Sequence, residues 1–308
     1  MSSTQSPAGT SIRKQRLSFS ILFVLLWSTG FIVAKIGLRY AGPFTFILIR
    51  MGIAIVIMGI FALVMKARWP RQLKTICHLA VAGVLTHAVY LGASWSAVAQ
   101  EVPVGIVAII AGLQPLVTSV LAGPMLGEKT TQRQWIGLLV GFLGIFIIVE
   151  PRLQAAILSF QGIALAVFAL LGITLGTLYQ KRFCRNIDLR SGQVIQLIAA
   201  SLVIWPWVFW MQEKPIEWSG EFVFSLFWMS IVLSGIAITF LTWLIYNAPA
   251  ASVAVLFYVT PPLAMVYAYI ILGENLGWLG IAGMAVTISG LILTITKKAP
   301  TKHRHQPL

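Results

Sequence analysis

The chain has 308 residues, of which 58% are hydrophobic and only 10% are charged, and its mean hydropathy is +0.90. Soluble globular domains carry about 25% charged residues because a surface in water must be solvated, so this composition excludes a soluble domain. The formal net charge is +14. Because the basic residues flank apolar runs instead of forming a patch on a solvated domain, we expect no nucleic-acid partner.

Ten apolar runs follow one another along the chain, each close to the about 20 residues that span a bilayer. They lie at 18–38, 44–65, 75–97, 103–125, 133–149, 161–181, 191–211, 222–246, 249–272 and 276–295. The strands of a membrane β-barrel would be shorter and would alternate in polarity, which these runs do not. We therefore predict an all-α integral membrane protein with ten transmembrane helices and the lipid bilayer as its surroundings.

The basic residues are divided unequally between the two sides of the predicted bundle. With both termini in the cytoplasm, seventeen lysines and arginines fall on the inner side and four on the outer side, which agrees with the positive-inside rule. Residues 1–17 and 297–308 are then cytoplasmic tails. The first run continues past Trp27 without a small-residue cleavage site, so we predict an uncleaved first helix. Cys77 and Cys184 fall near the inner side, and we expect reduced thiols with no metal role.

The two halves of the chain resemble each other at a constant offset of 146 residues. The aligned pairs include Pro103 with Pro249, Pro115 with Pro261, Leu126-Gly127-Glu128 with Leu272-Gly273-Glu274, Lys35 with Lys181, and Arg50 with Gln196. We therefore predict two repeats, 18–149 and 150–296. Each holds five helices, an odd number, so the second repeat runs inverted in the membrane. Inverted repeats are typical of secondary transporters, because two similar halves can rock about a fixed midplane site.

Several short motifs accompany this repeat. They are Trp27-Ser28-Thr29-Gly30-Phe31, Arg50, Gln114-Pro115, Leu126-Gly127-Glu128, Pro261-Pro262 and Leu272-Gly273-Glu274. Together with the helix count, they resemble the drug/metabolite transporter superfamily in its ten-helix EamA-type branch, over about residues 18–296. The resemblance implies a multi-pass permease of the bacterial inner membrane that exports amino acids or other small metabolites.

One departure from that superfamily concerns acidic residues. Its four-helix multidrug members use a glutamate in the first helix for proton coupling, whereas the first helix here has no acid. All eight acids of the chain lie at or near predicted helix ends. We infer that the substrate is not an organic cation held by a membrane carboxylate. Proton-driven export of a quaternary ammonium dye would contradict this hypothesis.

Proline-interrupted helices at matching positions of two inverted halves are the best sequence indication of a transporter site. Pro115 and Pro261 occupy such positions and are the predicted hinges, because each removes an amide and frees carbonyls for other partners. The alternative is a simple packing kink.

Five polar or charged residues at membrane depth are candidate substrate contacts: Arg50, His87, Gln114, Thr118 and Gln196. Gln114 and Thr118 lie four apart on one helical face. Arg50 has the chemistry to meet a substrate carboxylate, or alternatively it snorkels outward or binds helix-end carbonyls. His87 is the candidate for proton coupling, or alternatively it is neutral and bonded to a neighbouring helix.

Four aromatic residues complete the predicted substrate-binding set: Trp27, Tyr90, Tyr179 and Tyr258. Buried rings of this kind accept apolar or aromatic side chains, although each is also typical of simple packing. Trp205, Trp207, Trp210 and Trp218 instead match an interfacial belt.

No enzyme signature, nucleotide-binding loop or metal-ligand cluster occurs in the sequence, so we predict a non-enzyme with no cofactor and no metal. The glycine patterns around Gly137, Gly172 and Gly280 indicate close helix packing. They leave open whether the fifth and tenth helices only scaffold the halves or also form a homodimer contact. The predicted function is export of an amino acid or related small-molecule substrate by alternating access. The alternatives are an importer or exchanger of anionic metabolites, and a non-transport membrane sensor or partner protein.

Overall fold

The computed structural model describes residues 7–100, 102, 104–150, 160–272 and 277–295, and it is helical, with no strand in these ranges. The first half contains α1 (Pro7–Gly37), α2 (Pro43–Val64), α3 (Leu73–Gly83), η1 (Val84–Val89), α4 (Tyr90–Ala99), α5 (Val104–Gly112), α6 (Gln114–Leu126) and α7 (Gln132–Val149). The second half contains α8 (Phe160–Phe183), α9 (Leu189–Trp210), α10 (Gly220–Phe227), η3 (Trp228–Ala237), α11 (Ile238–Asn247), α12 (Ala250–Ala254), η4 (Val255–Val259), α13 (Thr260–Leu272) and α14 (Gly277–Ile295).

These elements combine into ten membrane helices. Within the described residues, nine segments are long and apolar enough to cross a membrane, and Gln132–Ile148 is a shorter apolar helix. Two of the segments, Leu73–Ala97 and Gly220–Asn247, run continuously through the π-helical stretches η1 and η3. The predicted all-α, ten-helix membrane fold is therefore confirmed.

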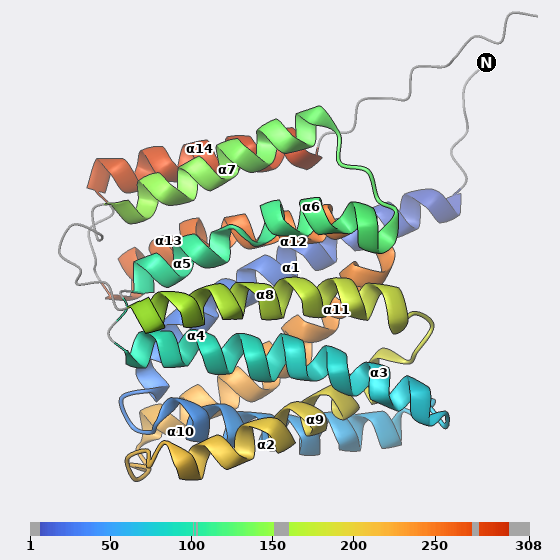
Figure 1. Ribbon diagram of the computed structural model, residues 1–308, viewed down its shortest axis with the longest axis vertical. Helices are drawn as coiled ribbons and strands as arrows, with labels where there is room; N and C mark the ends of the chain where they lie inside the picture. Colours follow the sequence, from blue (N-terminus) through green and yellow to red (C-terminus); the bar gives the residue numbers. More distant parts are fainter. Residues whose placement is uncertain (1–6, 101, 103, 151–159, 273–276, 296–308) are drawn as a thin grey trace, which may run out of the picture.

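The helices form a bundle, seen in Figure 1 with its long axis vertical. One edge is the pair α7 and α14, and the other edge is made by α2, α9 and α10. Between these edges, α3–α4, α5–α6 and α8 lie in front of α1, α11 and α12–α13 in this view (Figure 1). The middle of the bundle therefore contains helices from both halves of the chain.

Glycines bring α7 and α14 into backbone contact. A Cβ placed on Gly290 would lie 2.3 Å from the amide nitrogen of Gly141, and one on Gly144 would lie 2.3 Å from Oγ1 of Thr287. Small residues at a membrane helix interface allow this close approach, so the predicted packing role of the glycine pattern is confirmed for this pair.

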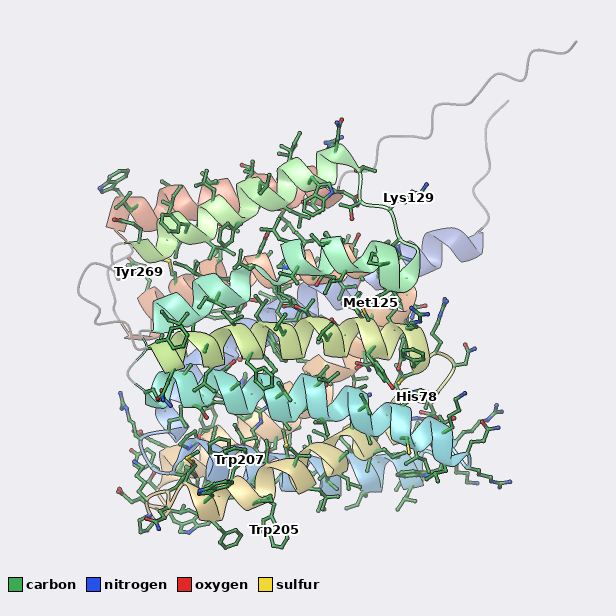
Figure 2. The ribbon with its side chains drawn as sticks, in the orientation of Figure 1. His78, Met125, Lys129, Trp205, Trp207 and Tyr269 are labelled. Carbon is green, nitrogen blue, oxygen red and sulfur yellow. The ribbon has the colours of Figure 1, made fainter. Side chains whose placement is uncertain are left out.

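Lysines and arginines gather at one end of the bundle, which we call the basic end. Here α2, α6 and α8 finish and α3, α7 and α9 begin, and the connecting residues include Lys66, Arg68, Lys129 and Arg185. Figure 2 shows His78, Met125 and Lys129 toward this end and Tyr269 toward the opposite end. The four tryptophans predicted to form a belt are exposed, at 40–76% of their surface, in and after the far end of α9.

Two groups outside the membrane-spanning segments have shifted pKa values at the basic end. A hydrogen bond from the Arg190 side chain is the main cause that lowers the pKa of Asp188 to about 2, so this carboxylate stays ionised at neutral pH and caps α9. Burial raises the pKa of the Cys184 thiol to about 12, whereas Cys77 is exposed. Cys184 is therefore a poor nucleophile.

Candidate functional site

A cavity lies in the middle of the bundle between the two halves of the chain. Its lining comes from α1, η1, α8, α9 and α11, and consists of Trp27, Thr86, His87, Ile173, Thr177, Gln180, Gln196, Ile238, Leu241, Thr242 and Ile245. The volume of this cavity is about 20 Å³. This is room for a water molecule and not for a metabolite, so the structure is contracted around the cavity.

His87 reaches the cavity from the π-helical turn η1. π-helical turns are rare and often occur at functional sites, because they widen the backbone locally and reorient side chains. The end of α3, directly before η1, is pressed against α9, since a Cβ on Gly83 would lie 2.4 Å from the carbonyl oxygen of Gln196. The predicted candidates His87 and Gln196 are thus brought together on one wall of the cavity.

A second cavity continues toward the basic end and shares Thr177 and Ile245 with the first. It is lined by Gln114, Thr177, Lys181, Ile245, Ala250, Val253, Ala254 and Phe257. Trp27, which lines the first cavity, and Phe257, which lines the second, are in edge-to-face contact with ring centroids 5.8 Å apart. An aromatic pair therefore lies where the two cavities meet.

The predicted hinge prolines lie where membrane helices are interrupted. Pro115 is in the first turn of α6, just after the break that separates α5 from α6. Pro261 is in the first turn of α13, after the 3₁₀ stretch η4. Proline fits a first turn because the missing amide has no intrahelical partner there. The breaks leave Gln114 and Phe257 on the wall of the second cavity.

A polar network lies at the basic end of the second cavity. Nζ of Lys181 lies 2.5 Å from Oε1 of Glu128, and Oε2 of Glu128 accepts a 2.7 Å hydrogen bond from the amide of Ala250. Lys181 also donates to the carbonyl of Ala248 at 2.5 Å. Two further arginines donate to carbonyls nearby, Arg182 to Met125 at 2.7 Å and Arg16 to Asn247. We call the Glu128–Lys181 pair and its contacts at Ala248 and Ala250 the basic-end latch.

Arg50 and Tyr90 lie next to His87 but outside the lining of either cavity. Met51, Ala88 and Leu91 are the chain neighbours of Arg50, His87 and Tyr90, and they pack in one apolar cluster. Arg50 is only 5% exposed, and neither of the two ion pairs in the described part of the chain includes it. The structure thus brings Arg50, His87 and Tyr90 into one group.

Three other candidates lie outside the cavity linings. The Tyr258 hydroxyl donates to the carbonyl of Leu138 at 3.0 Å, and its ring packs against Gly141. The Tyr179 hydroxyl lies 2.7 Å from Nδ1 of His78, on the α3–α8 contact near the basic end. Thr118 is buried on α6, and its hydroxyl has no hydrogen-bond partner. A role for these residues as substrate contacts remains a prediction.

The sequence did not indicate four polar residues of the first cavity: Thr86, Thr177, Gln180 and Thr242. Gln180 and Thr242 face each other across the cavity, with Nε2 of Gln180 3.5 Å from Oγ1 of Thr242. The available signal was the i, i+3 spacing of Thr177 and Gln180, which places both on one face of α8. This spacing did not indicate a site because the adjacent Lys181 and Arg182 resemble an ordinary charged helix end.

Comparison with known proteins gives the family. The model of the EamA-like transporter family matches residues 16–150 and again 160–296. The uncharacterized transporter YvbV of Bacillus subtilis (strain 168) is 26% identical over 94% of this chain and 94% of its own length. A probable amino-acid metabolite efflux pump of Salmonella typhimurium is 22% identical over 90% and 93%. A probable terminal-alkyne amino-acid exporter of Streptantibioticus cattleyicolor is 25% identical over 89% and 91%.

A solved crystal structure has the same fold. It superposes with a TM-score of 0.77 over 91% of this chain and 97% of that chain, at 16% sequence identity.

Proposed function

Because the chain belongs to the EamA-like transporter family, we propose that it exports an amino acid or a related small metabolite by alternating access. The coarser conclusion, a multi-pass membrane transporter, follows from the family and from the membrane-spanning helices. Two relatives named as handling amino acids support the proposed substrate class. The positive-inside rule supports a basic end that faces the cytoplasm of a bacterial inner membrane.

The observation that carries the proposal is the central cavity with the basic-end latch beneath it. Lys181 lines the second cavity and also binds Glu128, so the latch forms the floor of the cavity. A carrier must pass through a state closed to one side, and a contracted cavity above a closed end is such a state. Trp27, His87, Gln114 and Gln196 are the lining residues that we propose to contact the substrate.

Counterflow in proteoliposomes tests the proposal. Vesicles that contain the purified protein are loaded with one unlabelled L-amino acid at a time, and uptake of the same labelled compound at trace concentration is followed. We expect transient accumulation with at least one amino acid, and none in vesicles without protein. If no amino acid gives counterflow in vesicles shown to contain folded protein, the proposed substrate class is wrong.

One observation favours a second candidate, the import or exchange of anionic metabolites. Arg50 is the one permanently charged side chain among the buried residues of the described chain, and no acid is buried with it. Counterflow with phosphate esters, and not with amino acids, would support this alternative.

A further inference from the structure

Arg50 is a buried charge, and the part of the chain that the structure describes contains no buried acid to balance it. Its side chain lies on α2 about 10 Å inward from Pro43, at about 1.5 Å per residue. Because it is 5% exposed, it does not snorkel to the surface of the bundle, and its Nε has no hydrogen-bond partner. An isolated arginine at membrane depth is costly, so such a residue is retained where something else compensates its charge.

Other polar groups in this region also lack hydrogen-bond partners. Nε2 of His87 and Nε1 of Trp95 are also buried without a hydrogen-bond partner. Tyr90 and Trp95 pack against the apolar cluster on α2, η1, α4 and α9, which also holds Met51 and Ala88, the chain neighbours of Arg50 and His87. His87 and Tyr90 can accept hydrogen bonds, but neither supplies the negative charge that would compensate Arg50.

Among the described residues, no acid is buried beside Arg50. Glu128 and Asp188 lie at the basic end, where they bind Lys181 and Arg190. The surrounding cluster consists of apolar side chains such as Ile47, Met51 and Leu197. A planar guanidinium matches the geometry of a carboxylate, which can accept two parallel hydrogen bonds from it.

We propose that Arg50, with His87 and Tyr90 beside it, anchors the carboxylate of the transported substrate. The inference rests on the proposed function and narrows its substrate class to compounds with a free carboxylate. His87 belongs both to this group and to the cavity lining, so it connects the anchor with the space that holds the rest of the substrate. An organic cation without a carboxylate would leave the charge of Arg50 uncompensated and is excluded by the same argument.

The test compares Arg50→Met with wild type and with the control Arg133→Met, which alters an exposed arginine at the start of α7. Thermal unfolding of the purified full-length protein is measured without ligand and with each standard L-amino acid, its α-carboxamide, and L-lactate. Without ligand, we expect Arg50→Met to unfold at the same temperature as wild type or higher, because an unpaired buried charge has been removed. An arginine with a structural role would instead give a lower unfolding temperature.

With ligand, we expect carboxylates to raise the unfolding temperature of wild type and Arg133→Met, and the carboxamides to bind at least about tenfold more weakly. Arg50→Met should lose the response to carboxylates, and Arg50→Lys should retain part of it because it keeps a cation. Equal responses to acids and amides, or an unchanged response in Arg50→Met, would overturn the inference.

Counterflow distinguishes a failure of the proposed function from a failure of the proposed carboxylate anchor. Suppose that wild type carries amino acids and their carboxamides equally well, and that Arg50→Met carries amino acids as well as wild type does. The proposed function then stands and the anchor is wrong. If wild type carries none, the proposed function fails, and the carboxylate-dependent unfolding shift still decides the anchor. Absence of any such shift in wild type overturns the anchor as well.

Discussion

Glu128 holds three segments of the chain together through one carboxylate. Its two oxygens bind Lys181 on α8 and the first amide of α12, and Lys181 in turn binds the carbonyl of Ala248. The side chains are 25% and 11% exposed, so the pair is neither fully buried nor fully solvated. We therefore expect its loss to cost the closed state about 1–2 kcal/mol, between the ranges for exposed and buried pairs.

The substitution Glu128→Gln keeps the shape of the side chain and removes its charge. We predict that it opens the basic end, with an increase of about 5–30-fold in the ratio of open to closed molecules. The measurement is the rate at which a membrane-impermeant maleimide labels Val253→Cys, in the second cavity, in inside-out membrane vesicles. The background is Cys77→Ser, and the buried Cys184 is kept.

Glu217→Gln is the matched control, because Glu217 is exposed at the opposite end of the bundle. Its labelling rate should equal that of the parent protein. If Glu128→Gln also labels at the parent rate, the latch does not restrict access to the cavity.

The sequence indicated the components of this latch but not their contact. Lys181 was found through its repeat partner Lys35, and Glu128 through the Leu-Gly-Glu motif. Their meeting depends on how α6 and α8 pack, and no local pattern encodes a contact between positions 53 residues apart. Arg50 and His87 were identifiable singly because polar groups at membrane depth are rare, whereas their common neighbourhood required the packed structure.

At the scale of elements, α7 and α14 behave as one unit because their backbones touch. Gly290→Ala would place a methyl group 2.3 Å from the amide nitrogen of Gly141, which forces the two helices apart. We predict a loss of about 1–3 kcal/mol in stability, the usual cost of overpacking. Thermal unfolding in detergent measures it as a lower midpoint temperature.

Gly59→Ala is the control for this prediction. A Cβ on Gly59 would have no atom within 4 Å, and alanine is the better helix former by about 1 kcal/mol. Its midpoint should equal or exceed that of the parent protein. Equal midpoints for Gly290→Ala and Gly59→Ala would show that α7 and α14 relax apart without cost.

The existence of the helices was predictable, whereas their irregularities were not. Length and hydropathy are enough to define a membrane span, since the bilayer dictates both. The π-helical turn that carries His87 and the 3₁₀ stretch before α13 have no corresponding composition signal. Prolines did indicate the interruptions at α6 and α13, because proline is tolerated in the first turn that follows a break.

At the scale of the whole molecule, the two halves share one cavity. The lining of the first cavity takes Trp27, Thr86 and His87 from the first half and Gln180, Gln196 and Thr242 from the second. Any relative movement of the halves therefore changes the shape of the site itself. For alternating access the basic end must open in every cycle, because the substrate enters or leaves there.

A reversible cross-link across the latch tests this requirement. In Glu128→Cys/Lys181→Cys, made with Cys77→Ser and Cys184→Ser, a short bis-methanethiosulfonate reagent joins α8 to the segment that follows α6. We predict that cross-linking abolishes counterflow and that dithiothreitol restores it, because the closed end is first fixed and then released. Each single-cysteine variant, treated in the same way, should keep its own rate. Counterflow that persists in fully cross-linked protein would mean that the substrate passes without opening of the basic end, and the carrier would then need a path other than the one between α6, α8 and α12.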